Sequence, residues 1–266
     1  MTPTGWIMRD GFRLALHDAG GAGRPVLFQH GLCGDARQVA EAFPDDARLR
    51  RVVLECRGHG ASDFDPAPSL AKFTDDLAAV VEAIGGPVPV GGISMGAALA
   101  LRLAVARPEL VSHLALVRPA WGAGDAPPAN LELNAEVGML LYRFSVAEAR
   151  TAFLESETAA RLRVEAPDNL ASLTGFFARE PVSRTAVLLS VLSREGLGVS
   201  AADLAGLRLP VLVCGTAEDA IHPVGLAQAL AAGMGWARYI DLPPKGRDKA
   251  AHLSALHAAI SGFLTE

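Results

Sequence analysis

The chain has 266 residues, of which 50% are hydrophobic and 20% are charged. This length suits one large α/β domain, and this hydrophobic share excludes intrinsic disorder. The net charge of −5, with no basic stripe, argues against nucleic acid or a membrane surface as a partner. No apolar run reaches the roughly 18 residues that a membrane span needs, and the N-terminus lacks a signal-peptide layout. We therefore expect a cytoplasmic protein.

The first sixty residues alternate short apolar runs with glycine-rich turns. Residues 6–8 and 12–17 are predicted strands joined by the turn dipeptide Asp10-Gly11. Residues 25–29 and 51–55 are more uniformly apolar, which is typical of strands buried on both faces of a sheet.

Helices then alternate with strands. Residues 70–84 place apolar side chains three and four apart, with Ser69 as a candidate N-cap and Gly85 as a stop. A strand at residues 88–93, an alanine-rich helix at 95–106 and a strand at 110–117 follow.

The character of the chain changes after residue 118. Residues 119–130 are rich in proline and glycine, and the stretch from 131 to 198 shows helical patterns only. Strand, helix, strand and helix resume from about residue 210. The order predicts a doubly wound, mostly parallel sheet built from residues 1–118 and 205–266, with a helical cap at 119–204 inserted after the sixth strand.

The run Gly92-Ile93-Ser94-Met95-Gly96 joins a predicted strand to a predicted helix. In a nucleophile elbow the serine occupies a turn too tight for side chains on the flanking positions, which glycine satisfies. The following helix directs its N–H groups toward a developing oxyanion. The context predicts Ser94 as a nucleophile.

A serine nucleophile needs a base, and histidine is the usual one. His252 follows the last predicted strand and precedes the last predicted helix, so we expect it above the carboxyl edge of the sheet. His17 and His113 lie on strands, and His257 lies on the final helix. His222 precedes Pro223 at a helix start, and His30 and His59 belong to turns. We predict His252 as the base.

A carboxylate must orient the imidazole. Asp219 follows the strand that ends at Cys214-Gly215, and Glu218 is an immediate alternative. Either could instead cap the helix near Pro223. We favour Asp219.

The oxyanion needs two N–H donors. The backbone groups of Leu32, after His30-Gly31, and of Met95 form the expected pair. Cys33 adjoins this loop, where it either lines the site or fills space. Cys56 and Cys214 lie in apolar runs and are expected to be buried.

Together these motifs resemble the α/β-hydrolase family. The matching elements are His30-Gly31, Arg57-Gly58-His59-Gly60-x-Ser62, the pentapeptide around Ser94, Asp219 with Pro223, and His252 before a C-terminal helix. The resemblance covers about residues 5–118 and 205–264. It implies a sheet of about eight strands and a helical lid over Ser94.

Substrate choice is expected to depend on the insertion. Candidate pocket residues are His30, Cys33, Trp121 and Tyr142, which would favour an apolar or aromatic ester-like substrate. The alternative is that the aromatic residues of the insertion pack it onto the main domain. Arg118, at the hinge, could pair a substrate carboxylate.

The sequence therefore predicts a serine hydrolase of small carboxylic esters, lactones or thioesters, with no metal or organic cofactor. A carbon–carbon bond hydrolase, a lyase or a cofactor-free haloperoxidase-like enzyme on the same triad is the second hypothesis. A non-catalytic ligand receptor is the third. Oligomeric state is not indicated.

Overall fold

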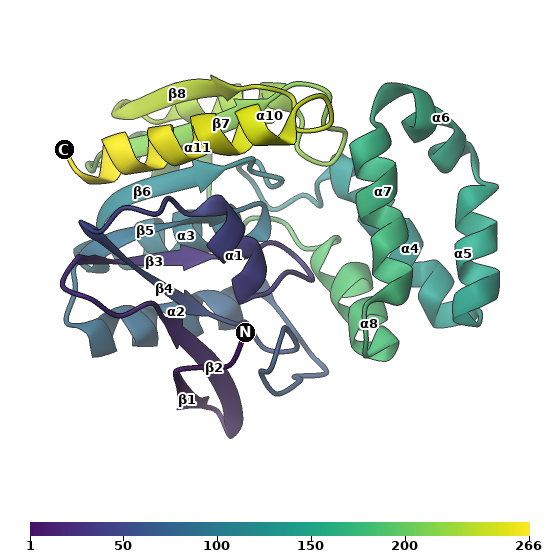
Figure 1. Cartoon of the computed structure of the whole chain (residues 1–266), viewed down its shortest axis with the longest axis horizontal. Coiled ribbons are helices and arrows are strands. Elements are labelled where there is room, and N and C mark those ends of the chain that lie inside the picture. Colours follow the sequence, from purple (N-terminus) through teal and green to yellow (C-terminus); the bar gives the residue numbers. More distant parts are fainter.

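A computed structural model describes all 266 residues, and its centre is one eight-stranded sheet (Figure 1). The strand order is β1-β2-β4-β3-β5-β6-β7-β8. The antiparallel pairs are β1 with β2 and β2 with β4, and all remaining pairs are parallel, which confirms the predicted doubly wound fold. The strands are β1 (Gly5–Arg9), β2 (Phe12–Asp18), β3 (Arg24–Gln29), β4 (Leu49–Leu54), β5 (Val88–Ile93), β6 (Val111–Val117), β7 (Val211–Thr216) and β8 (Ala237–Leu242).

The first hairpin and the central strand show how local sequence sets the sheet. Asp10 and Gly11 both have positive φ, at 49° and 85°, as a two-residue turn that follows the strand twist requires. Pro89 lies in β5, between two neighbouring strands, where it cannot donate a ladder hydrogen bond. The register between β5 and β6 shifts at Val88 and Pro89, so the irregularity falls where the proline interrupts the ladder.

Helices cover both faces of the sheet and create two apolar cores. A core of 18 buried residues lies under α1 (Ala36–Ala42) and α11 (Lys249–Leu264). A core of 54 buried residues includes α2 (Leu70–Ile84), α3 (Met95–Ala106) and α10 (Val224–Gly233). Helix α1 was not predicted, because seven residues give too few turns for an apolar periodicity.

The caps of α2 match the sequence prediction. The Ser69 hydroxyl accepts a hydrogen bond from the Lys72 N–H, and Gly85 ends the helix with a φ of 89°. These two residues satisfy backbone groups that the helix itself leaves unpaired.

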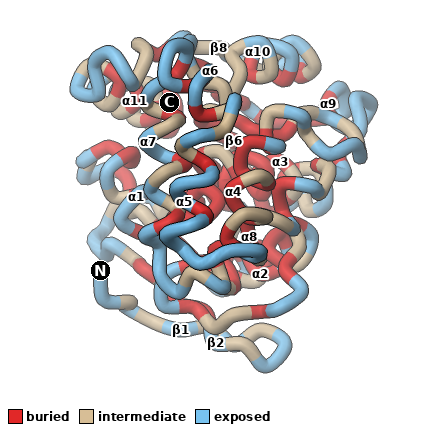
Figure 2. The backbone as a smooth tube through the Cα atoms, turned by 90° about the vertical axis from the view of Figure 1, so that its right-hand side faces the viewer, coloured by how far each residue is buried: buried red, intermediate tan, exposed pale blue.

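The insertion forms a separate layer of helices beyond the carboxyl ends of the parallel strands (Figure 1). Its helices are α4 (Glu132–Arg143), α5 (Val146–Leu154), α6 (Glu157–Glu165), α7 (Pro167–Gly175) and α8 (Val182–Leu192). Figure 2 views this layer from outside, and buried and exposed residues alternate along the helices. Helix α9 (Ala201–Gly206), inside the predicted cap boundary, packs against α10 of the main domain.

None of these helices combines the length and the apolar character that crossing a bilayer requires.

Candidate active site

Ser94 stands at a sharp turn between β5 and α3. Its φ of 56° and ψ of −111° are strained for a residue with a side chain, and its N–H donates to the Val117 carbonyl at 3.0 Å. A Cβ at Gly92 would lie 2.5 Å from the Gly96 carbonyl carbon, and one at Gly96 would overlap the Gln29 carbonyl. The chain therefore needs glycine at both outer positions, as a nucleophile elbow does.

The loop after β3 lies against this turn. A Cβ at Gly31 would be 3.4 Å from the Ser94 Cβ, so the two backbones approach closely. The Leu32 N–H has no acceptor within the chain, while the Gly31 N–H donates to the Gln38 side chain at 2.7 Å. Met95 is the first residue of α3, where the helix provides no acceptor for the N–H. Both predicted oxyanion donors are thus available.

Two neutral histidines accept hydrogen bonds from backbone N–H groups at and next to this loop. Nε2 of His59 accepts from the Cys33 N–H at 3.0 Å, and Nε2 of His30 accepts from the Cys56 N–H at 3.1 Å. Burial lowers the pKa of both rings, which keeps them uncharged. The prediction that His30 lines the substrate pocket is wrong, because the ring is fully buried and both of its nitrogens are engaged.

Cys33 is buried next to the oxyanion loop and reaches the wall of the cavity beside Ser94. Burial raises the pKa of its thiol to about 12. The thiol therefore stays protonated near neutral pH and is a wall residue rather than a nucleophile.

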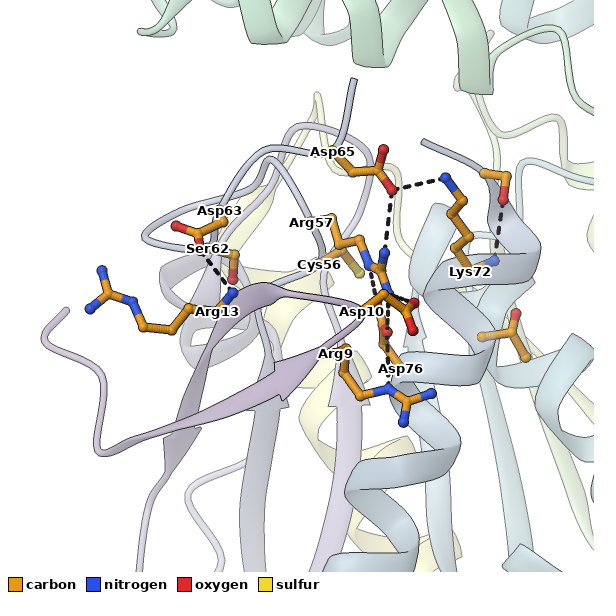
Figure 3. Close-up of polar contacts among 12 residues, drawn as sticks. Arg9, Asp10, Arg13, Cys56, Arg57, Ser62, Asp63, Asp65, Lys72 and Asp76 are labelled. Atoms are coloured by element: carbon orange, nitrogen blue, oxygen red, sulfur yellow. Dashed lines mark hydrogen bonds and ion pairs between the residues drawn. The ribbon is translucent and has the colours of Figure 1, made fainter. Parts of the chain in front are cut away.

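A buried ion-pair network supports the loop that holds His59 (Figure 3). The Arg57 guanidinium donates from Nε and from Nη2 to the Asp76 carboxylate, at 2.8 Å in both cases. It also contacts Asp65 at 3.3 Å and Asp10 at 2.6 Å. These contacts connect the first hairpin, the loop after β4 and α2, so the Arg57 motif has a structural role here.

Asp219 forms the polar centre of the site. Its carboxylate accepts from Arg118 at 2.6 Å, from Asn169 at 2.9 Å and from Nδ1 of His222 at 2.9 Å. Burial alone would raise the pKa of Asp219, but the charge of Arg118 and the hydrogen bonds from His222 and Asn169 outweigh it and hold the pKa below its usual range. Asp219 is therefore ionised.

The alternative acid points elsewhere. Glu218 has a φ of 59° and accepts from Nε of Arg247 at 2.8 Å, on the exposed surface. The prediction that Arg118 is free to pair a substrate carboxylate is also wrong, because its guanidinium is already held by Asp219.

His222 is the histidine that Asp219 contacts. Its ring is buried, and its Nε2 has no hydrogen-bond partner in the chain. Burial lowers the pKa of His222, and Arg118 lowers it further, against the opposing charge of Asp219. The sequence placed His222 only at a helix start, although the spacing Asp-x-x-His could have indicated a contact between the two side chains.

His252 lies inside the last helix, whereas the sequence placed it just before that helix. It lies within the first turns of α11, because Asp248 caps the helix by accepting from the Ala251 N–H and the His252 N–H donates to the Asp248 carbonyl. Its Nδ1 lies 2.8 Å from the Pro243 carbonyl. Its ring nitrogen thus contacts Pro243 in this structure, while burial lowers the pKa of the ring and the charge of Asp219 opposes that shift.

A cavity of about 530 Å³ opens beside Ser94 and under the insertion. His222 is the single histidine on its wall, and the loop between β8 and α11 contributes Lys245 to it. The insertion contributes Asn134 from α4, Asn169 from α7, and Phe176 just after α7. Five of its nineteen lining residues are hydrophobic, so the wall is mostly polar.

Two aromatic residues that the sequence predicted for the substrate pocket lie elsewhere. Trp121 is buried, and its Nε1–H donates to the Glu195 carbonyl at 2.9 Å, so it fills the core between the insertion and the sheet. Tyr142 is 76% exposed on α4. Neither residue lines the cavity beside Ser94.

Known proteins are similar to this chain in fold and in sequence. A family model described as the alpha/beta hydrolase fold matches residues 24–180. Over 85% of this chain and 80% of the relative, the sequence is 30% identical to 2-hydroxymuconate semialdehyde hydrolase from Pseudomonas sp. (strain CF600).

Solved structures also match this chain in fold. The structure of Rv0554 from Mycobacterium tuberculosis matches with a TM-score of 0.71 at 26% identity, over 95% of this chain and 93% of that one. The enol-lactonase from Burkholderia xenovorans LB400 matches with a TM-score of 0.72 over 98% of this chain and 100% of that one. At 20% identity, the second likeness shows the fold alone.

Proposed function

Because the chain belongs to the α/β-hydrolase family and is a hydrolase, we propose that it cleaves small carboxylic esters, lactones or thioesters through an acyl-enzyme on Ser94. The observation that supports this most directly is the backbone of Ser94. A positive φ on a non-glycine residue costs about 1–3 kcal/mol, and it persists at functional sites where the surrounding structure enforces it. Here it presents the hydroxyl at a cavity.

The proposed reaction proceeds in two stages. Ser94 Oγ gives its proton to a histidine and attacks the carbonyl carbon, and the N–H groups of Leu32 and Met95 stabilise the oxyanion. The bond to the leaving group breaks as the histidine returns the proton to it. Water then repeats the sequence on the acyl-Ser94, with the Asp219 carboxylate stabilising the charged imidazole.

The cavity wall suggests the character of the substrate. The sequence favoured an apolar or aromatic group, but Phe176 is the one aromatic side chain on this wall. Arg179 and Lys245 lie on it with polar residues of the insertion. These groups favour a small polar substrate, including one with a carboxylate.

We also propose that the insertion, residues 119–204, acts as the lid of this cavity. Three of its elements contribute side chains to the wall, so its position decides which substrates reach Ser94. The main domain would then consist of residues 1–118 and 205–266, with α9 packed against it at the boundary.

A fluorophosphonate probe tests the proposed nucleophile. We expect stoichiometric labelling of the wild type at Ser94, located by mass spectrometry of the digested protein, and none in the Ser94→Ala variant. The matched control is Ser172→Ala, since Ser172 is another serine on the same wall and should leave labelling intact. Equal labelling of Ser94→Ala and wild type would contradict the proposal.

Substrate class is then measured with esters, lactones and thioesters, each in a neutral and a carboxylate-bearing form. We expect turnover that disappears in Ser94→Ala, with carboxylate-bearing members preferred. Turnover that survives this substitution would exclude the acyl-enzyme route.

A second candidate is carbon–carbon bond hydrolysis on the same residues. The relative named 2-hydroxymuconate semialdehyde hydrolase favours it, because the compound in that name contains no ester linkage. Product analysis on a panel of diketones separates the two candidates, since only carbon–carbon hydrolysis yields a carboxylic acid and a ketone from those compounds.

A further inference from the structure

Four arginine and lysine side chains lie on the wall of the cavity beside Ser94. Three of them have a carboxylate partner: Arg37 pairs with Asp35 at 2.7 Å, Arg118 with Asp219 at 2.6 Å, and Lys245 with Asp168 at 3.0 Å. The fourth, Arg179, forms no ion pair, and its guanidinium makes no hydrogen bond within the chain. Arg179 is therefore the cation of this wall that remains available to an anionic group.

Arg179 also lies where two cavities meet. A second cavity of about 550 Å³ lies between α8 and the loop after β4, and both cavities are lined by Cys33, Asp35 and Arg179. Burial raises the pKa of the Cys33 thiol, and the Arg179 charge opposes that rise, as expected of a guanidinium close to the oxyanion loop. A substrate group that extends from Ser94 toward the second cavity would pass Arg179.

The backbone of Arg179 is held in place although its guanidinium is free. The Arg179 N–H donates to the Phe176 carbonyl at 3.2 Å, and the Arg179 carbonyl accepts from the hydroxyl of Thr185 at 3.0 Å. Thr185 is buried in α8. The side chain of Arg179 therefore starts from a fixed point of the insertion, while its charged end is exposed to the cavities.

The nearby carboxylates do not take the place of a ligand at Arg179. Four of them lie on the two cavities, and each has another partner. Asp35 binds Arg37, Glu41 pairs with Lys249, Glu55 accepts from the N–H groups of Ala36 and Ala61, and Glu180 accepts from the Val182 N–H. No acid of the chain is thus committed to Arg179.

We propose that Arg179 binds a carboxylate of the substrate and so determines specificity, an inference that rests on the proposed acyl-enzyme chemistry at Ser94. A guanidinium donates two parallel hydrogen bonds to a carboxylate, a geometry that an ammonium group does not match. The substrate class is an ester or thioester with a carboxylate on the part that reaches from Ser94 toward the second cavity. Arg179 exchanges no proton in the reaction and acts through binding alone.

The test compares carboxylate-bearing esters with their neutral, methyl-capped counterparts in the full chain. Monophenyl adipate places the carboxylate on the acyl part, and 4-acetoxybenzoate places it on the leaving group. The readout is the ratio of kcat/KM for release of the phenol between the charged and the neutral member of each pair. We expect the wild type to prefer the charged member in at least one pair.

In Arg179→Gln this ratio should fall about 10- to 100-fold, as the loss of a charge-assisted pair implies, with kcat/KM for the neutral ester changed by less than about threefold. Arg179→Lys should retain part of the preference, because it keeps the charge but not the fork of donors. A merely structural role would lower both members of a pair equally, and that result would overturn the inference.

Arg184→Gln is the matched control. Arg184 also lacks a carboxylate partner, but it lines only the second cavity, where its guanidinium carbon lies 5.8 Å from the centre of the Phe64 ring. We expect its ratio to stay within about threefold of the wild type. An equal fall in Arg184→Gln would attribute the preference to the general positive charge of the region and overturn the assignment to Arg179.

The same experiment separates this inference from the proposed function. Turnover that depends on Ser94 but shows no preference for either carboxylate-bearing ester would overturn the role of Arg179 and leave the proposed function intact. Absence of both ester turnover and fluorophosphonate labelling in the wild type would instead overturn the proposed function, and the inference with it.

Discussion

The cluster of Arg118, Asp219 and His222 combines an ionised acid with a neutral histidine. Arg118 and Asp219 neutralise one another within the buried site, which offsets the cost of desolvating each charge. Burial and the Arg118 charge lower the pKa of His222, with Asp219 opposing and Lys245 adding to the shift. The His222 ring therefore stays neutral at pH values where a solvated histidine is charged, and the same Arg118 charge lowers the pKa of His252.

The pH profile of kcat/KM should reveal this arrangement. A base acts only when unprotonated, so with His252 as the predicted base, activity falls as the pH drops through the pKa of His252. Burial and the Arg118 charge lower that pKa, so the midpoint should lie below 6.5. In Arg118→Gln the charge that lowers this pKa is gone, so the midpoint should move to higher pH. Arg37→Gln is the control, because Arg37 lies on the same cavity but pairs with Asp35. A midpoint that stays fixed or falls in Arg118→Gln would contradict this account.

The turn at Ser94 could be predicted from the sequence, but the contact between Asp219 and His222 could not. Ser94 has a local signature, since flanking glycines and a strand-to-helix turn arise from five consecutive residues. His222 has none that distinguishes it from any residue before Pro223, because its contact with Asp219 depends on how the two side chains are buried. The position of His252 was missed for a related reason. The apolar spacing of α11 starts at Leu253, while its cap at Asp248 begins the helix earlier.

At the scale of elements, α7 docks directly on the loop that holds the acid. Asn169 is buried in its first turn, donates to Asp219 at 2.9 Å and accepts from the Ala220 N–H at 2.7 Å. Its neighbour Asp168 pairs with Lys245 at 3.0 Å. One helix of the insertion thus positions the acid and a wall residue together, which explains how residues far apart in sequence act at one site.

Asn169→Ala should lower catalysis through this contact. It removes one hydrogen bond from the Asp219 carboxylate and leaves the Ala220 N–H unpaired, so the loop that carries Asp219 should become less ordered. We expect kcat to fall about tenfold, as the loss of roughly one hydrogen bond in the transition state implies, with KM less affected. Steady-state kinetics on the best ester measures both constants.

Asp168→Asn is the matched control for that substitution. It weakens the partly exposed ion pair with Lys245, which is worth about 0–1 kcal/mol, and leaves Asp219 untouched. Equal losses of kcat in the two variants would show that α7 affects catalysis by packing against this part of the site, and not through the Asn169 side chain.

At the scale of the molecule, the insertion shares its core with the sheet. The larger core of 54 buried residues runs from α2 and α3 through Trp121 into α4 and α8. The sequence predicted helices between residues 131 and 198, but it could not divide the aromatic residues of this segment between core and cavity. Both uses require the same apolar character, and only the packed fold decides which side chain faces which space.

Trp121→Ala should therefore destabilise the whole molecule rather than the insertion alone. The indole is buried at the junction, so its removal should cost about 3–5 kcal/mol of unfolding free energy. Tyr142→Ala, on the exposed face of α4, should change it by less than about 0.5 kcal/mol. Urea titrations followed by far-ultraviolet circular dichroism measure both, and the wild type should unfold in one transition. Two separated transitions, with Trp121→Ala shifting only the earlier one, would show that the insertion unfolds independently and that the continuous core does not couple it to the sheet.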